Sequence, residues 1–325
     1  MEPEQLFHYC STEAAFNILK TRSLRLCDIR KSNDSAELIL FYPELFDALR
    51  RAYGDAPFAF EYRGETGARG LSKLVGECEE LVNWEMAEGS LTNYVFSMSE
   101  HGDMLSQWRG YANDSKGVSL GFCYEALRDF AEGNELFSFA QVQYIFQSDV
   151  DRLVMEYARG ILGELRDMRA RLCEWADAAD VEQLILFHTH ASITRAIAGS
   201  LRYKRNGFSE EREWRLFMTD SAFKVLEDSF PKLIRYAPED SDIARQRRVE
   251  AVHEHLDFFP ADDDIVSYYA IPFEEFPAPV LRTFRLGANN FARFQDLKLM
   301  LRRFGIPGPV SCERSRITSY RRKQI

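Results

Sequence analysis

The chain has 325 residues, of which 46% are hydrophobic and 28% are charged. These are ordinary values for a globular protein, and they exclude the disordered and fibrous classes. The net charge of −10 argues against general adhesion to nucleic acid, because phosphate binding depends on Lys and Arg.

The sequence also lacks signals for a membrane or an oxidising compartment. No apolar run approaches the roughly 20 residues that span a bilayer, and the N-terminus has no signal-peptide pattern. The six cysteines lie far apart, without any Cys-x-x-Cys pair, which favours free thiols over disulfides or a zinc site. We therefore expect a cytoplasmic protein without membrane contact.

Apolar periodicity predicts the secondary structure along the chain. In chain order it indicates a strand at 6–7, a helix capped by Ser11 or Thr12, a strand at 24–26, helices at about 36–52 and 71–87, strands at 94–99, 117–122 and 137–146, a helical hairpin from 154 to about 201, strands at 214–218, 266–271 and 280–286, and a helix at 291–304. Strands at both ends are separated by helical blocks, which favours an α+β fold over a doubly wound sheet. We expect one domain over residues 1–325, with helical insertions at about 36–90 and 148–201.

The clearest candidate site is the segment that begins at Glu211. On a strand, Glu211, Glu213 and Arg215 would share one face, so two carboxylates and a guanidinium would project together. Like-charged neighbours raise each other's pKa unless a cation or ligand compensates, which makes Arg215 a sensible partner. The alternative is an exposed strand edge with an ordinary Glu–Arg pair, and the sequence leaves both open.

Two further segments carry candidate binding groups. His8, at a strand-to-helix turn, is placed to hydrogen-bond a ribose hydroxyl, although a lone His is more often structural. The segment 107–111 offers an indole, a guanidinium and a phenol, which suit a nucleobase and a pyrophosphate or, equally, a turn that packs on the sheet.

Several common types of site have no support. His188 and His190 are two apart on a predicted helix and point to nearly opposite sides, so they cannot share one metal ion. His253 and His255 meet the same objection, and we expect no metal site. The chain has no G-x-G-x-x-G, P-loop or G-x-S-x-G motif, which removes support for ordinary dehydrogenases, P-loop NTPases and α/β-hydrolases.

Several segments along the chain form a recognisable set of motifs. They are His8-Tyr9-Cys10-Ser11 with Leu24-Arg25-Leu26, Asn33-Asp34 and Glu37, Val95 to Ser99, Gln107 to Tyr111 with Gly117 and Gly121-Phe122, Phe208 to Leu216, and Ser315 to Arg321. In this order, over nearly the whole chain, they resemble a known bacterial family, domain of unknown function 2971.

The family's layout in turn resembles distant ADP-ribosyltransferases, especially the branch that acts on nucleic acid. This resemblance implies a split antiparallel sheet core with NAD as the substrate. It assigns a role to each candidate residue: Glu213 as the catalytic carboxylate, Glu211 as its Glu-x-Glu partner, His8 at the NAD ribose, Tyr9, Trp108 or Tyr111 stacked on nicotinamide or adenine, Ser97 or Ser99 on the middle strand, and Arg109, Arg215 or Arg321 at the pyrophosphate.

Three functional hypotheses follow. The first is an NAD-consuming ADP-ribosyltransferase-like enzyme, a bacterial toxin, effector or phage-defence component that modifies nucleic acid or protein. The second is a catalytically silent ligand- or partner-binding module, in which the 148–201 hairpin contacts a partner such as an antitoxin. The third is a nucleic-acid hydrolase that uses Glu211, Glu213 and a divalent ion.

Overall fold

The computed structural model describes residues 2–31, 40–88, 93–134, 136–172, 178–218, 255–261 and 264–317. Its helices are α1 (Thr12–Thr21), α2 (Tyr42–Asp55), α3 (Gly67–Glu88), α4 (Leu105–Gly110), α5 (Tyr124–Glu132), α6 (Gln147–Leu172), α7 (Ala178–Gly199) and α10 (Phe294–Arg303). The 3-10 helices are η1 (Ile29–Lys31), η2 (Ser200–Arg202), η3 (Asn206–Glu211) and η5 (Phe273–Glu275). The strands are β1 (Gln5–Cys10), β2 (Ser23–Asp28), β3 (Glu61–Tyr62), β4 (Glu65–Thr66), β5 (Tyr94–Ser99), β6 (Val118–Cys123), β7 (Phe137–Gln141), β8 (Gln143–Ile145), β9 (Tyr203–Arg205), β10 (Glu213–Met218), β11 (Leu256–Ala261), β12 (Asp264–Pro272), β13 (Leu281–Leu286) and β14 (Ser311–Arg314).

One ten-stranded sheet organises the molecule, with small two-stranded pairs β3–β4 and β8–β9 beside it. The main path runs β11-β12-β2-β5-β1-β6-β13-β14, and β10 pairs with both β5 and β7. Among the described strands of this sheet, β13 and β14 are the only ones that pair in parallel. The α+β class that the element order predicted is therefore confirmed, and the sheet is largely antiparallel.

The central strand β5 has an unusual set of partners. One edge pairs with β10 over five residues. On the other edge, β2 pairs with Tyr94 and Val95, while β1 pairs with Ser99. The sheet therefore opens between β1 and β2, beside the middle of β5.

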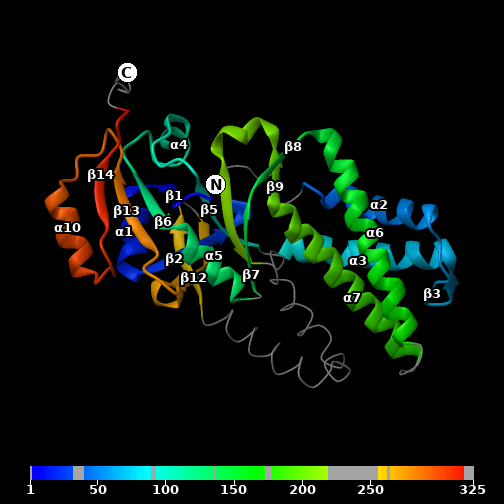
Figure 1. Cartoon of the computed structure of the whole chain (residues 1–325). Helices are drawn as coiled ribbons and strands as arrows, with labels where there is room; N and C mark the ends of the chain where they lie inside the picture. The colour runs from blue at the N-terminus through cyan, green and yellow to red at the C-terminus, as the bar shows by residue number, and fades with distance from the viewer. Residues whose placement is uncertain are drawn as a thin grey trace.

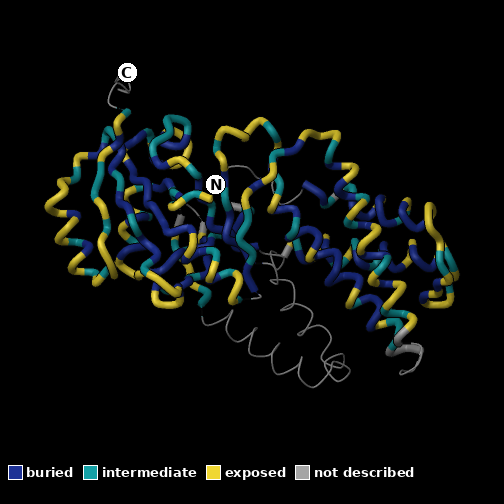
Figure 2. The backbone as a smooth tube through the Cα atoms, viewed as in Figure 1, coloured by how far each residue is buried: buried dark blue, intermediate teal, exposed yellow. Residues whose placement is uncertain are grey.

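The two faces of β5 are covered differently. Tyr94, Phe96 and Met98 point into the core of the sheet, which α1, α5 and α10 also help to form. Val95 points the other way, into a second core built mainly by α2, α3, α6 and α7. Figure 1 shows this helical group beside the sheet, and Figure 2 shows buried residues in both parts.

Most predicted elements are present, with shifts at their ends. The strand at 94–99 and the Ser11 cap are confirmed, the latter by a 3.0 Å bond from the Ala14 N–H to the Ser11 hydroxyl. The strand predicted over 137–146 divides at Val142 into β7 and β8. Five cysteines are free thiols, namely Cys10, Cys27, Cys78, Cys123 and Cys312.

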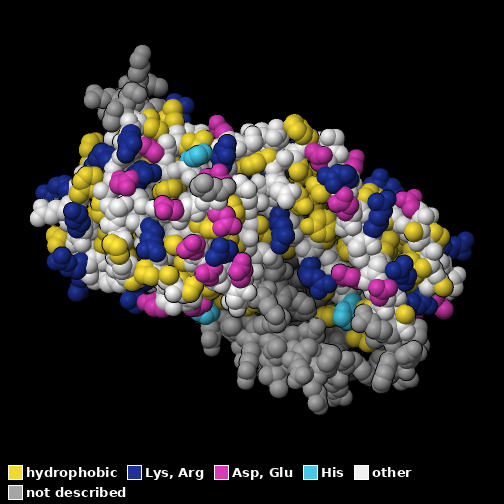
Figure 3. Space-filling model, viewed as in Figure 1, with side chains coloured by type: hydrophobic (Ala, Val, Ile, Leu, Met, Phe, Trp, Pro, Cys, Tyr) yellow, Lys and Arg dark blue, Asp and Glu magenta, His cyan; other side chains and the backbone are white. Residues whose placement is uncertain are grey.

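The surface carries mixed charges. Lys and Arg side chains alternate with Asp and Glu across the face shown in Figure 3. Among the described helices, none combines the length and apolar character needed to cross a membrane.

The junction of the sheet with the helical group gives a first prediction. Phe217 of β10 is completely buried in the helical core, so Phe217→Ala should lower the free energy of unfolding by about 3–5 kcal/mol. Phe291 is 97% exposed, and Phe291→Ala should change the free energy of unfolding by less than about 0.5 kcal/mol. Urea unfolding of both variants measures the difference. Equal losses of unfolding free energy in the two variants would show that the burial of Phe217 at this junction contributes little to stability.

Candidate functional site

A polar cluster lies on one face of β5 and β10, where the helical core ends. Val95 and Phe217 pair across the two strands and belong to that core. The next pair on the same face is Ser97 with Arg215, and the one after it is Ser99 with Glu213. One face of the two strands thus changes from apolar to polar within four residues.

Glu213 and Arg215 form a buried ion pair at the start of β10. Arg215 donates from Nε to Glu213 Oε1 at 2.7 Å and from Nη2 to Oε2 at 3.0 Å. Its Nη1 donates to the carbonyl of Leu201 at 2.9 Å. Glu213 is 5% exposed and Arg215 1% exposed, so this pair is shielded from water.

The charge on Glu213 is set by its neighbours. Burial raises the pKa of this carboxyl, but Arg215, Lys204 and the Ser97 hydroxyl outweigh burial and bring the pKa down to about 2. Glu213 is therefore an anion throughout the physiological pH range.

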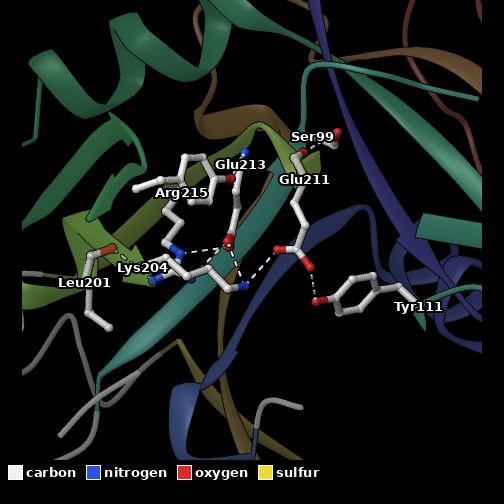
Figure 4. Close-up of polar contacts among 8 residues, drawn as sticks. Ser99, Tyr111, Leu201, Lys204, Glu211, Glu213 and Arg215 are labelled. Carbon is white, nitrogen blue, oxygen red and sulfur yellow. Dashed lines mark hydrogen bonds and ion pairs between the residues drawn. The ribbon is translucent and has the colours of Figure 1, made fainter. Parts of the chain in front are cut away.

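Lys204, on β9, links the two glutamates (Figure 4). Its Nζ donates to Glu211 Oε2 at 2.8 Å and to Glu213 Oε2 at 3.2 Å. Glu211 belongs to η3 and not to β10, and Arg212 between them has a left-handed φ of 43°. The prediction that 211, 213 and 215 alternate along one strand is therefore wrong for Glu211, which Lys204 connects to the cluster instead.

Tyr111 lies at the outer side of this cluster. Its hydroxyl donates to Glu211 Oε1 at 2.9 Å, and the residue is 37% exposed. Ser99 donates to the Glu211 carbonyl at 2.7 Å and fixes the backbone of η3 against β5. Burial raises the pKa of Tyr111, so its phenol keeps the proton that it donates. Tyr111 and Glu211 are thus the accessible part of the site.

The other two candidate aromatics are covered. Trp108 is completely buried, packs edge-on against Tyr9 at 4.9 Å, and donates from Nε1 to Asp103 at 2.8 Å. The Tyr9 hydroxyl donates to the His101 carbonyl and accepts from the Met104 N–H. Both rings hold α4 on the sheet, which leaves Tyr111 as the candidate with an exposed ring.

His8 lies close to the cluster but on the other face of the sheet. It is paired with Leu120, and its ring stacks on Phe96 at 4.3 Å, on the side opposite Ser97 and Glu213. Its Nδ1–H donates to the Ser97 carbonyl at 2.9 Å, in the opening between β1 and β2. Burial lowers the pKa of His8, which keeps the ring neutral. The His8 ring thus supplies a hydrogen bond to the Ser97 carbonyl, at the point where β1 diverges from β2.

The three candidate arginines have different environments. Arg215 uses its guanidinium within the protein, as described above. Arg109 is exposed on α4, near Tyr111 in the chain. Arg321 lies outside the described residues, as do Asn33, Asp34 and Glu37.

Two residues of the cluster were missed by sequence reasoning. Lys204 is 4% exposed, yet in the sequence it is one basic residue among several around 202–205. Tyr144 of β8 accepts a hydrogen bond from the Glu213 N–H at 2.8 Å, and burial raises its pKa to about 12. Both come from the pair β8–β9, whose parallel pairing has no local sequence signal.

No group of three or more His, Cys, Asp or Glu side chains is placed to hold a metal ion within the described ranges. His190 contacts Glu85 instead, with Nε2 at 3.0 Å from Oε2, and both side chains are buried between α7 and α3.

The ion pair gives a second prediction. Arg215→Leu leaves Glu213 buried with less compensation and should lower the free energy of unfolding by about 3–5 kcal/mol at pH 7. The exposed pair Arg152–Glu156 provides the control, since Arg152→Leu should cost less than about 1 kcal/mol. Because the folded pKa of Glu213 is depressed from 4.5 to about 2, its stabilising contribution is complete above pH 4.5 and is lost as pH falls toward 2.

The difference in the free energy of unfolding between wild type and Arg215→Leu should therefore become smaller as pH falls. Urea unfolding at several pH values measures it. A difference that stays constant from pH 7 to pH 3 would contradict the assigned charge state.

The comparisons with known proteins concern this same region. Residues 107–216 match the family model described as "Protein of unknown function (DUF2971)". No curated protein and no solved structure matches the chain. The matched segment extends from α4 to β10 and contains Tyr111, Lys204, Glu211, Glu213 and Arg215. It confirms, over these residues, the DUF2971 family that the sequence motifs indicated.

Proposed function

We propose that this protein cleaves NAD by ADP-ribosyltransferase-like chemistry, with Glu213 as the carboxylate that faces the ribose. The observation that carries the proposal is the geometry around Glu213, a 5% exposed carboxylate that Arg215 and Lys204 both contact and thereby keep anionic despite its burial. Nicotinamide leaves the ribose through an oxocarbenium-like state, as in glycoside cleavage. A fixed anion in a site shielded from water stabilises that developing positive charge.

The second carboxylate supplies a distinct function. Glu211 is joined to Glu213 through Lys204 and is in contact with the partly exposed Tyr111. A carboxylate at the accessible side of the site can take a proton from the incoming nucleophile. The exposed Tyr111 ring provides an aromatic surface for nicotinamide.

The opening of the sheet supports the same proposal. The divergence of β1 and β2 along one edge of β5 supports the proposal of an ADP-ribosyltransferase-like split sheet. His8 does not share the face of Glu213, so the proposal gives it a structural role and no contact with ribose. A function as a toxin, effector or phage-defence component belongs to this proposal. A partner such as an antitoxin, held by the hairpin α6–α7, belongs to the alternative of a binding module.

One observation favours a second candidate, a binding module without catalysis. Both carboxylates are already compensated inside the protein, by Arg215 and Lys204, as in a structural ion-pair network. A metal-dependent hydrolase receives less support, because Lys204 Nζ occupies the position between the two carboxylates that a divalent ion would need.

Nicotinamide release from NAD tests the proposal. Glu213→Gln should reduce the rate at least about 100-fold, as loss of a group that stabilises the transition state does. Glu213→Asp keeps the charge and retracts the carboxylate by one methylene, and it should also reduce the rate of nicotinamide release about 100-fold. Glu210→Gln is the matched control, since Glu210 is exposed on η3, and it should keep full activity.

Circular dichroism and thermal unfolding establish that each variant is folded. Wild-type protein that releases no nicotinamide would overturn the enzyme and favour the binding module. Folded Glu213→Gln or Glu213→Asp protein with undiminished release would overturn the assignment of Glu213 as the carboxylate that acts on NAD.

A further inference from the structure

A pocket of about 200 Å³ lies at the ends of the parallel strands β8 and β9. Its apolar part consists of Ile145 and Val150, and its polar part of Gln147, Asn206 and Arg205. Phe146 and Gly207 complete the lining, and Phe146, which lies between the end of β8 and the start of α6, is 62% exposed. None of these side chains belongs to the carboxylate cluster.

The backbone that carries the exposed ring is held in place at the entry to α6. Phe146 precedes α6, and its N–H donates to the Asp149 carboxylate at 3.0 Å, while the Asp149 N–H donates to the Phe146 carbonyl at 2.9 Å. This reciprocal pair closes the first turn of the helix. Because Asp149 already compensates the helix N-terminus, the pocket's affinity for an anion depends on Arg205 and not on the helix.

The lining combines three kinds of contact that a nucleotide needs. An exposed aromatic ring stacks on a base, the amides of Gln147 and Asn206 can each donate and accept at a base edge, and Arg205 can fork to a phosphate. The volume is below the roughly 300–1,000 Å³ of pockets that enclose a whole drug-sized ligand. It therefore suits one base, with sugar and phosphate outside.

The pocket and the carboxylate cluster are joined by the same two strands. In β8, Tyr144 contacts Glu213 and the next residue lines the pocket. In β9, Lys204 contacts both glutamates and the next residue, Arg205, lines the pocket. After it, η3 leads from the pocket at Asn206 to the cluster at Glu211. The two sites therefore flank η3.

We propose that this pocket holds a nucleotide of the acceptor, so that the acceptor of the proposed transferase is a nucleotide, free or within a single strand. This inference rests on the proposed function for its role, but the pocket's affinity can be measured without NAD. The chain's net charge of −10 makes non-specific nucleic-acid binding a weak competitor.

Fluorescence anisotropy with a labelled single-stranded oligo(dA) of about ten nucleotides tests the pocket in the full chain. Phe146→Ala should weaken binding about 5- to 150-fold, the range for loss of one stacked base. Arg205→Ala should weaken it and lower the slope of log K against log salt by about one. Phe291→Ala and Arg293→Ala are matched controls on exposed residues that do not line the pocket, and both should bind as wild type does.

Competition with AMP identifies the source of the nucleotide. Displacement of the oligonucleotide by AMP indicates a free or terminal nucleotide, and its failure indicates an internal nucleotide of a strand; both support the pocket. Wild-type protein without oligonucleotide affinity, or equal affinity in Phe146→Ala, would overturn it.

Nicotinamide release separates this inference from the proposed enzyme. Phe146→Ala should hydrolyse NAD with unchanged KM when no oligonucleotide is present. A raised KM would make the pocket part of the NAD site and overturn the acceptor assignment. If Phe146→Ala loses oligonucleotide affinity while neither wild type nor any variant cleaves NAD, the nucleotide pocket stands and the proposed enzyme activity is overturned.

Discussion

The buried contact between Glu213 and Arg215 is the interaction on which the arrangement of sheet and helices depends. Removing two charges from water costs several kcal/mol per ion, and only close pairing with further hydrogen bonds offsets this cost. Arg215 meets the requirement with two bonds to Glu213 and one to the Leu201 carbonyl, at the end of the helical core. The same side chain thus fixes the start of β10 and connects it to the helices.

The rest of the cluster follows from charge balance. A second carboxylate, Glu211, requires a second cation, and Lys204 supplies it by contacting both glutamates. Two acids and two bases leave the buried cluster neutral, while the pKa of Glu213 stays near 2. An anion that is ionised at every physiological pH, yet shielded from water, suits the stabilisation of a cationic transition state. The surrounding strands keep it in place before any ligand arrives.

The sequence allowed much of this to be predicted, because the main signals are local. The alternation of Tyr94 to Ser99 predicted a strand, and the structure has β5 there, with Phe96 in the core of the sheet and Val95 in the helical core. Glu213 and Arg215 were expected together for the same reason. The position of Glu211 was predicted incorrectly, since the left-handed backbone at Arg212 interrupts the alternation before β10 begins.

Other features depend on contacts between distant segments. The parallel pairing of β8 with β9 brings Lys204 and Tyr144 to the site, and the sequence of neither short strand indicates which strand it pairs with. His8 was expected beside the carboxylate, but its pairing with Leu120 turns the ring to the opposite face. Trp108 looked like a ligand-stacking group, yet it is enclosed under α4. Side-chain type indicated the chemistry, whereas pairing decided which groups meet.

The ionisation of Glu213 is the central physical claim, and carbon NMR measures it directly. In protein labelled at the glutamate carboxyl carbons, the resonance absent from Glu213→Gln identifies this group. We expect Glu213 to titrate with a midpoint at about 2, far below the ordinary value of 4.5. A midpoint at or above 4.5 would contradict the compensated anion and, with it, the proposed chemistry.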